Sequence, residues 1–118
     1  MVNFKKNRMY TIGVEEEYML CNPKTGDLIN KAYDLMEMIP EDCEDRFSYE
    51  LLLSEIESNT KICQDTNEAI DDIILHRKLL RDIGNKINCK IGISGTHPTA
   101  LSSEQKFIKN ESYNWVSD

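Results

Sequence analysis

The stretch from Tyr10 to Leu20 alternates with a period of two, and this pattern constrains the fold more than any other feature of the chain. One parity is mainly apolar: Ile12, Val14, Tyr18 and Leu20. The other parity holds Thr11, Gly13, Glu15, Glu17 and Met19. Because successive side chains of a strand point to opposite faces, the pattern predicts a β-strand with one face in a core and carboxylates on the other.

A second acidic stretch runs from Glu50 to Thr60 and is also predicted to be a strand. One predicted face holds Leu52 and Ile56, and the other holds Leu51, Leu53, Glu55 and Glu57. Each strand therefore carries an E-x-E pair whose members lie about 6 to 7 Å apart on one face. If the two strands belong to one sheet, up to four carboxylates converge.

Converging carboxylates repel one another and raise one another's pKa, and a divalent cation removes that penalty. Mg²⁺ prefers such oxygen ligands and is often completed by substrate phosphates. The alternative is that the alternating glutamates mark the solvated face of an edge strand. Glutamate has low strand propensity, so three consecutive glutamates in a strand, Glu15 to Glu17, need a compensating reason and are less easily explained by a solvated edge strand. Glu16 falls on the apolar parity and needs a basic partner or a rim position.

Turn and helix signals occupy the segments between the two acidic strands. Asn22 to Asp27 is predicted to turn, and Leu28 and Ile29 to begin a short returning strand. Lys31 to Ile39 has helical spacing and ends at Pro40. Glu41 to Asp45 is predicted to be an acidic, solvated loop.

A longer helix is predicted after Asp65, which can serve as its N-cap, with Glu68 reaching back in a capping box. Its predicted apolar stripe consists of Ile70, Ile73, Ile74, Leu80, Ile83 and Ile87. His76 is assigned to the solvated side of this helix. A third strand is predicted over Lys90 to Ile93. Residues 1–118 are therefore expected to form a single α+β domain, an antiparallel sheet with helices on one face and carboxylates on the other.

Composition excludes several classes of protein. Fourteen Lys and Arg against 21 Asp and Glu give a net charge of -7, the opposite of the balance that binds nucleic acid. No apolar run approaches the roughly 20 residues that span a bilayer, and no apolar segment follows the basic N-terminal residues. None of the four cysteines forms a C-x-x-C pair. We therefore expect a cytoplasmic protein with free thiols and no membrane or nucleic-acid partner.

Three motifs resemble the type 2 glutamate–cysteine ligase family. T-I-G-V-E-E-E-Y-M-L at Thr11 to Leu20 is similar to its opening strand. E-L-L-L-S-E-I-E-S-N-T at Glu50 to Thr60 is similar to its second acidic strand, and S-G-T-H-P at Ser94 to Pro98 to its third motif. Order and spacing agree over nearly the whole stretch from Tyr10 to Val116.

The resemblance implies the N-terminal part of a longer catalytic domain with a glutamine-synthetase-like fold, whose antiparallel sheet floors an ATP and Mg²⁺ site. It implies an ATP-dependent carboxylate–amine ligase that forms an amide through an acyl phosphate. The substrates would be a glutamate-like carboxylate and an amine such as cysteine. The implied metal ligands are Glu15, Glu17, Glu55 and Glu57, and the implied substrate-binding residues are Thr96 and His97.

Other interpretations stay open at this point. His97 could be a loop histidine bonded to backbone groups rather than to substrate. The chain could also be a non-catalytic acidic metal-binding module or a regulatory subunit derived from the same fold. The later histidine-containing strand and basic phosphate-contacting residues of the family have no counterpart here, so a C-terminal partner segment or a homo-oligomer is compatible with the sequence.

Overall fold

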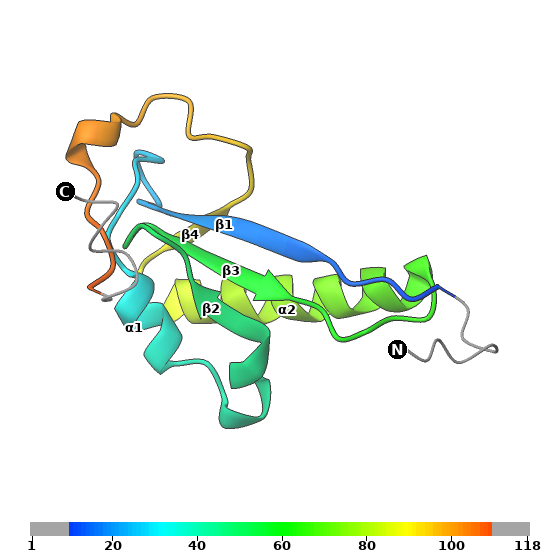
Figure 1. The fold of residues 1–118 in the computed structure, drawn as a ribbon. Coiled ribbons are helices and arrows are strands. Elements are labelled where there is room, and N and C mark those ends of the chain that lie inside the picture. The colour runs from blue at the N-terminus through cyan, green and yellow to red at the C-terminus, as the bar shows by residue number, and fades with distance from the viewer. Residues whose placement is uncertain (1–9, 110–118) are drawn as a thin grey trace.

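A computed structural model describes residues 10–109 and shows a mixed α+β fold built on one four-stranded antiparallel sheet (Figure 1). The N-terminal basic residues considered above lie outside this range. The strands are β1 (Glu15–Cys21), β2 (Phe47–Tyr49), β3 (Glu55–Asn59) and β4 (Lys90–Gly92). Their order in the sheet is β2-β3-β1-β4, so the two acidic strands β1 and β3 are central neighbours.

Two α-helices pack on the same face of the sheet. These are α1 (Ala32–Glu37) and the long α2 (Thr66–Lys86), and neither lies over the opposite face in the described part of the chain (Figure 1). The predicted acidic loop is a 3₁₀ helix, η1 (Glu41–Arg46), and a second one, η2 (Ser102–Glu104), follows β4. Among residues 10–109, no helix has the length and apolar character needed to cross a bilayer.

The core lies between the sheet and these helices. Tyr18 and Leu20 of β1 and Ile56 of β3 are completely buried there. Leu35 of α1 and Leu80 of α2 are equally buried from the helical side. Burying each such side chain contributes roughly 1.5 to 3 kcal/mol, so this face of the sheet holds the fold together. The alternation predicted for β1 therefore has its apolar parity in the core.

The two ends of α2 are determined by local hydrogen bonds. At the start, Asp65 Oδ1 accepts the N–H of Glu68 at 2.9 Å, which confirms the predicted N-cap. The Glu68 carboxylate reaches back as predicted, but it accepts the N–H of Gln64, at 2.8 Å, one residue before the N-cap. At the end, the N–H of Cys89 donates to Gly84 O at 2.8 Å. A Cβ at Gly84 would lie 2.6 Å from Cys89 O, so only glycine permits this close return of the chain into β4.

The predicted strand over residues 50–60 was wrong in its first half. The chain turns there, with the N–H of Glu55 bonded to Leu52 O, and the strand begins only at Glu55. The turn breaks the period of two, so Leu53 packs against the core while Leu52 lines a cavity on the other face. Leu28 and Ile29 likewise form only a bridge and a backbone bond to β1 rather than a strand.

The predicted apolar stripe of α2 was only partly correct. Ile70 and Ile74 are 52% and 43% exposed, whereas Leu80 and Ile83 are buried. His76, expected to be solvated, is only 6% exposed and its ring centroid lies 5.0 Å from that of Phe47. Burial lowers the pKa of His76, because the charged ring would lose its hydration against the core. The inward face of α2 therefore runs through Ala69, His76, Leu80 and Ile83 rather than through Ile70 and Ile74.

Candidate metal centre

Strand pairing places acidic side chains side by side on the face that carries no α-helix. Glu17 of β1 is paired with Glu57 of β3, and Glu57 is paired on its other side with Ser48 of β2. Paired residues of neighbouring strands point to the same face. The neighbouring pairs on this face flank the Glu17–Glu57 pair. Glu15 lies opposite Asn59 on one side of it, and Glu55 lies opposite Met19 on the other.

Three carboxylates come together on this face: Glu17, Glu50 and Glu57 each offer an oxygen, and these oxygens all lie within 4.8 Å of one another. Asn59 Nδ2 donates to Glu57 Oε1 at 3.0 Å and holds that side chain. Glu15 and Glu55, expected as further ligands, are not members of this group of three. We refer to Glu17, Glu50 and Glu57 as the acidic triad.

Glu50 was missed by the sequence analysis. The predicted strand over residues 50–60 gives Glu50 the parity of Leu52 and Ile56, but Glu50 in fact follows β2 and precedes the turn into β3, outside both strands. The period-two argument cannot place a side chain in irregular backbone. Only its position at the head of the second acidic motif, E-L-L-L-S-E-I-E, distinguished it from the other glutamates of the chain.

The electrostatics of the triad favour a cation. Burial, a hydrogen bond with Glu57 and the charges of Glu17 and Glu57 raise the pKa of Glu50 to about 7. Burial and the charge of Glu17 also raise the pKa of Glu55. Among residues 10–109, no lysine or arginine forms an ion pair with any of these carboxylates. Three oxygen donors without a basic partner fit a hard divalent cation such as Mg²⁺ or Mn²⁺.

The raised pKa of Glu50 predicts a specific pH dependence for the metal-free protein. Between about 4.5 and about 7 the folded state retains a proton that the unfolded chain has released. The free energy of unfolding contributed by Glu50 therefore falls as pH rises through this window. Urea melts in EDTA should show this slope, and Glu50→Gln should reduce it. Parallel pH profiles for both proteins would contradict the assignment.

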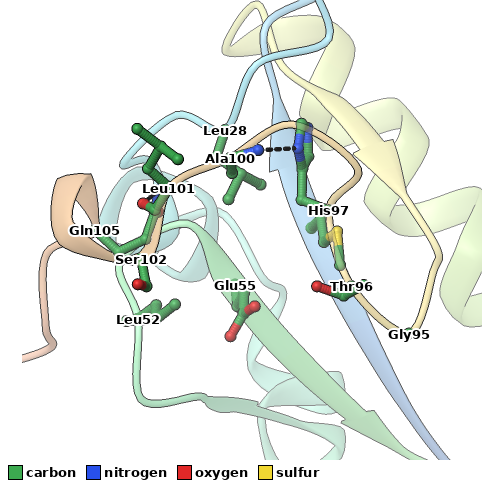
Figure 2. Close-up of a pocket in the computed structure, with 11 residues that line it drawn as sticks. Leu28, Leu52, Glu55, Gly95, Thr96, His97, Ala100, Leu101, Ser102 and Gln105 are labelled. Carbon is green, nitrogen blue, oxygen red and sulfur yellow. Dashed lines mark hydrogen bonds between the residues drawn. The ribbon is translucent and has the colours of Figure 1, made fainter.

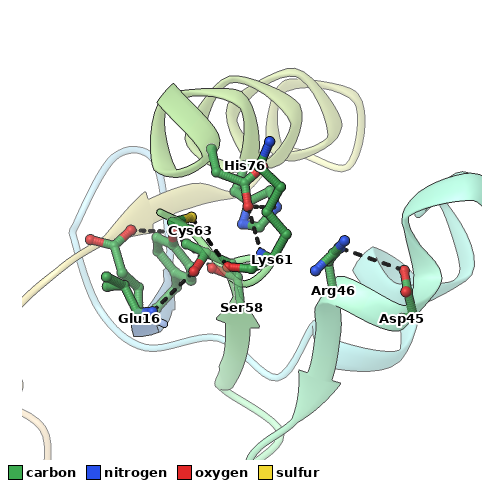
Figure 3. Close-up of polar contacts among 11 residues, drawn as sticks. Glu16, Asp45, Arg46, Ser58, Lys61, Cys63 and His76 are labelled. Carbon is green, nitrogen blue, oxygen red and sulfur yellow. Dashed lines mark hydrogen bonds and ion pairs between the residues drawn. The ribbon is translucent and has the colours of Figure 1, made fainter. Parts of the chain in front are cut away.

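The opposite face of β1 is anchored to α2 beneath the triad. Glu16, predicted to need a basic partner, is paired with Arg77: Nε donates to Oε2 at 3.0 Å and Nη2 donates to Oε1. Tyr18 Oη donates to Glu16, and Ser58 Oγ of β3 donates to Tyr18 Oη at 3.3 Å. Figure 3 shows Glu16 and Ser58 between the sheet and His76 of α2. The hydrogen bond from Arg77 lowers the pKa of Glu16, and burial raises that of Tyr18 to about 12.

Removing the Arg77 guanidinium should destabilise the fold. Glu16 is 14% exposed, so Arg77→Met leaves a largely buried carboxylate without its charged donor. We expect a loss of roughly 1 to 3 kcal/mol in the free energy of unfolding, the range for hydrogen bonds to charged groups. Arg81→Met is the matched control, because the Arg81–Asp82 pair is exposed and should contribute about 0.5 kcal/mol or less. Equal losses in the two variants, measured by urea melts, would refute the anchoring role.

Next to the triad, a cavity of about 190 Å³ opens on the same face of the sheet (Figure 2). Met19 and Glu55, a cross-strand pair, contribute from the sheet. The loop after β4 contributes Thr96 and His97, the two residues expected to bind substrate. The rest of the wall comes from Leu28, Leu52, Gly95, Ala100, Leu101, Ser102 and Gln105.

His97 holds the loop in place through its ring nitrogens. Nε2 lies 2.8 Å from Gly26 O, and Nδ1 accepts the N–H groups of Thr99 at 3.2 Å and Ala100 at 3.0 Å. Because Nδ1 accepts, Nε2 carries the proton and donates to Gly26 O. Gly26 itself has φ of 77°, as expected for the turn. The ring borders the cavity while both nitrogens are bonded to backbone, as the loop-histidine interpretation expects.

These features define a mixed α+β domain with an acidic candidate metal centre and an adjoining cavity. The profile of glutamate-cysteine ligase family 2 (GCS2) matches residues 11–118, and the chain belongs to this family. It is 32% identical over 123 residues to "Putative glutamate--cysteine ligase 2-1" of Rubrobacter xylanophilus, covering 98% of this chain and 31% of that protein. It is 27% identical to "Putative glutamate--cysteine ligase 2" of Rhodopirellula baltica, over 92% of this chain and 30% of that protein. The chain thus spans about three tenths of the length of these relatives.

Proposed function

We propose that this chain supplies the metal-binding carboxylates of an ATP-dependent carboxylate–amine ligase. The observation that carries the proposal is the acidic triad, three carboxylates within 4.8 Å without a basic partner in the described part of the chain. Membership of the glutamate-cysteine ligase family 2 supports it. The substrates would be a glutamate-like carboxylate and an amine such as cysteine, the pair named in the relatives.

In the proposed reaction the substrate carboxylate attacks the γ-phosphorus of ATP and ADP leaves. The neutral amine nitrogen then attacks the acyl phosphate carbon, the C–O bond to the phosphate breaks, and inorganic phosphate leaves while the nitrogen releases a proton to water as the amide forms. Bound Mg²⁺ would neutralise charge on the transferring phosphoryl group. Glu17, Glu50 and Glu57 would hold the cation at the sheet, and the hydrogen bond from Asn59 would orient Glu57 for it. The assignment of Glu15 and Glu55, on the same face, as further ligands stays a prediction.

A chimera tests this function. The chain would replace the matching N-terminal portion of the Rubrobacter xylanophilus relative, which supplies the remaining length. We expect ADP release that requires Mg²⁺, glutamate and an amine, together with an amide product detected by mass spectrometry. Glu57→Gln in the chimera should abolish both. A chimera that melts cooperatively and binds Mg²⁺ but releases no ADP would contradict the ligase and favour a non-catalytic metal-binding subunit.

A further inference from the structure

The cavity beside the triad has few polar side chains that are still free to bind a ligand. Both ring nitrogens of His97 are bonded to backbone atoms. Gln105 Oε1 accepts from Ser54 Oγ at 3.0 Å, and its Nε2 donates to Leu101 O at 3.2 Å. Within residues 10–109, the side chains of the lining that make no hydrogen bond or ion pair are the carboxylate of Glu55 and the hydroxyls of Thr96 and Ser102.

The charge of the lining selects the kind of ligand. Among residues 10–109, Glu55 is the only acidic residue that lines the cavity, and no lysine or arginine of that range does. A single carboxylate among hydroxyls and apolar side chains provides too few oxygen ligands for Mg²⁺ or Ca²⁺, which need six or more. It suits a primary ammonium group, whose three N–H donors can be shared between one carboxylate and two hydroxyl oxygens.

The size and the remaining wall restrict the ligand further. A volume of about 190 Å³ leaves room for a molecule of only a few heavy atoms. Met19, Leu52 and Leu101 provide an apolar surface for its substituent. Figure 2 shows Glu55 between Leu52 and Ser102 on one side and Thr96 on the other. The site is therefore concave, mainly apolar and marked by one charge, as small-ligand sites usually are.

We propose that this cavity binds the ammonium group of a small primary amine, with Glu55 as its counter-ion. Glu55 and Glu57 are two residues apart on β3, so the bound amine would lie about 6 to 7 Å along the strand from the triad. This places an amine beside the position where the acyl phosphate would form. In that sense the inference rests on the proposed function, and it assigns Glu55 to the amine rather than to the metal.

The test is an NMR titration of the ¹⁵N-labelled chain in EDTA with propylamine. A parallel titration with 1-propanol provides a neutral ligand of the same shape. We expect propylamine to shift the amide signals of Glu55 and of residues 94–105 with a millimolar dissociation constant, and 1-propanol to leave them unchanged. Glu55→Gln should weaken propylamine binding roughly tenfold or more. Glu15→Gln, on the same face but outside the cavity, should leave it unchanged. Thr96→Val gives a second variant that should also weaken binding.

Equal shifts by the two ligands, no shifts in the wild-type chain, or unchanged binding by Glu55→Gln would each overturn the inference. A Mg²⁺ titration of the same samples separates it from the proposed function. Glu55→Gln should retain the wild-type metal response, and loss of that response would return Glu55 to the metal site. Amine binding in a chain without any metal response would support the inference while contradicting the proposed metal centre.

Discussion

Leu80→Ala is expected to lower the free energy of unfolding by about 2 to 5 kcal/mol, a large part of the stability of a domain of this size. Leu80 is completely buried and belongs to the cluster formed by β1, β3 and α1. Alanine would remove the contacts of its side chain with that cluster and leave a cavity that the packed sheet can only partly fill. Urea melts of the purified variant measure the loss.

Ile74→Ala is the matched control on the same helix. Ile74 is 43% exposed, so the same kind of truncation should cost about 1 kcal/mol or less. The comparison tests the orientation of α2 directly, because the predicted stripe treated the two residues as equivalent. Equal losses for Leu80→Ala and Ile74→Ala would mean that the helix is rotated relative to the packing described here.

Removing two carboxylates of the triad should have opposite effects with and without metal. In EDTA, Glu17→Gln/Glu57→Gln should melt at a higher temperature than the wild type, because like charges no longer repel one another. In Mg²⁺ or Mn²⁺ the wild type should gain stability that the double variant lacks. By mass action, the free energy of unfolding of the wild type should rise by about 1.4 kcal/mol when the concentration of free cation is ten times its dissociation constant.

Glu41→Gln provides the control for net charge, because it removes one exposed carboxylate on η1, away from the triad, and its response to metal should match that of the wild type. Glu15→Gln instead tests the predicted further ligand: a weaker metal response than that of the wild type would add Glu15 to the site. Adding ATP tests whether phosphates complete the coordination, as the proposed function expects. An unchanged metal response in Glu17→Gln/Glu57→Gln would show that these glutamates are ordinary surface charges.

The regular elements of this fold could be predicted because their patterns are local. The alternation in β1 identified the faces of Glu17 and Tyr18, and the capping interaction at Asp65 identified the start of α2. The need of Glu16 for a basic partner was also predictable, since a carboxylate on a core-facing parity is costly. The identity of that partner could not be predicted. Arg77 lies 61 residues away in the sequence, and its position depends on how α2 crosses the sheet.

The remaining features depend on irregular backbone and on tertiary packing. The turn at Leu52 to Glu55 exchanges the predicted faces of Leu52 and Leu53, whereas Glu55, Ile56 and Glu57 lie on the faces predicted for them. Glu50, just before this turn, lies beside Glu57 instead of sharing the core face with Ile56. The burial of His76 could not be predicted from the sequence of α2, because Ile70 and Ile74 indicate a different buried face from the one that includes His76. Its position follows from the contact with Phe47 of β2, which the sequence of α2 does not contain.

We propose that Glu17, Glu50 and Glu57 together bind one divalent cation. Crystals of the chain soaked in Mn²⁺ test it most directly, because anomalous scattering locates the ion without reference to the protein density. We expect one strong peak on the open face of the sheet, about 2.0 to 2.3 Å from an oxygen of each of the three carboxylates. A strong peak elsewhere, or none at a Mn²⁺ concentration that raises the melting temperature in solution, would contradict it.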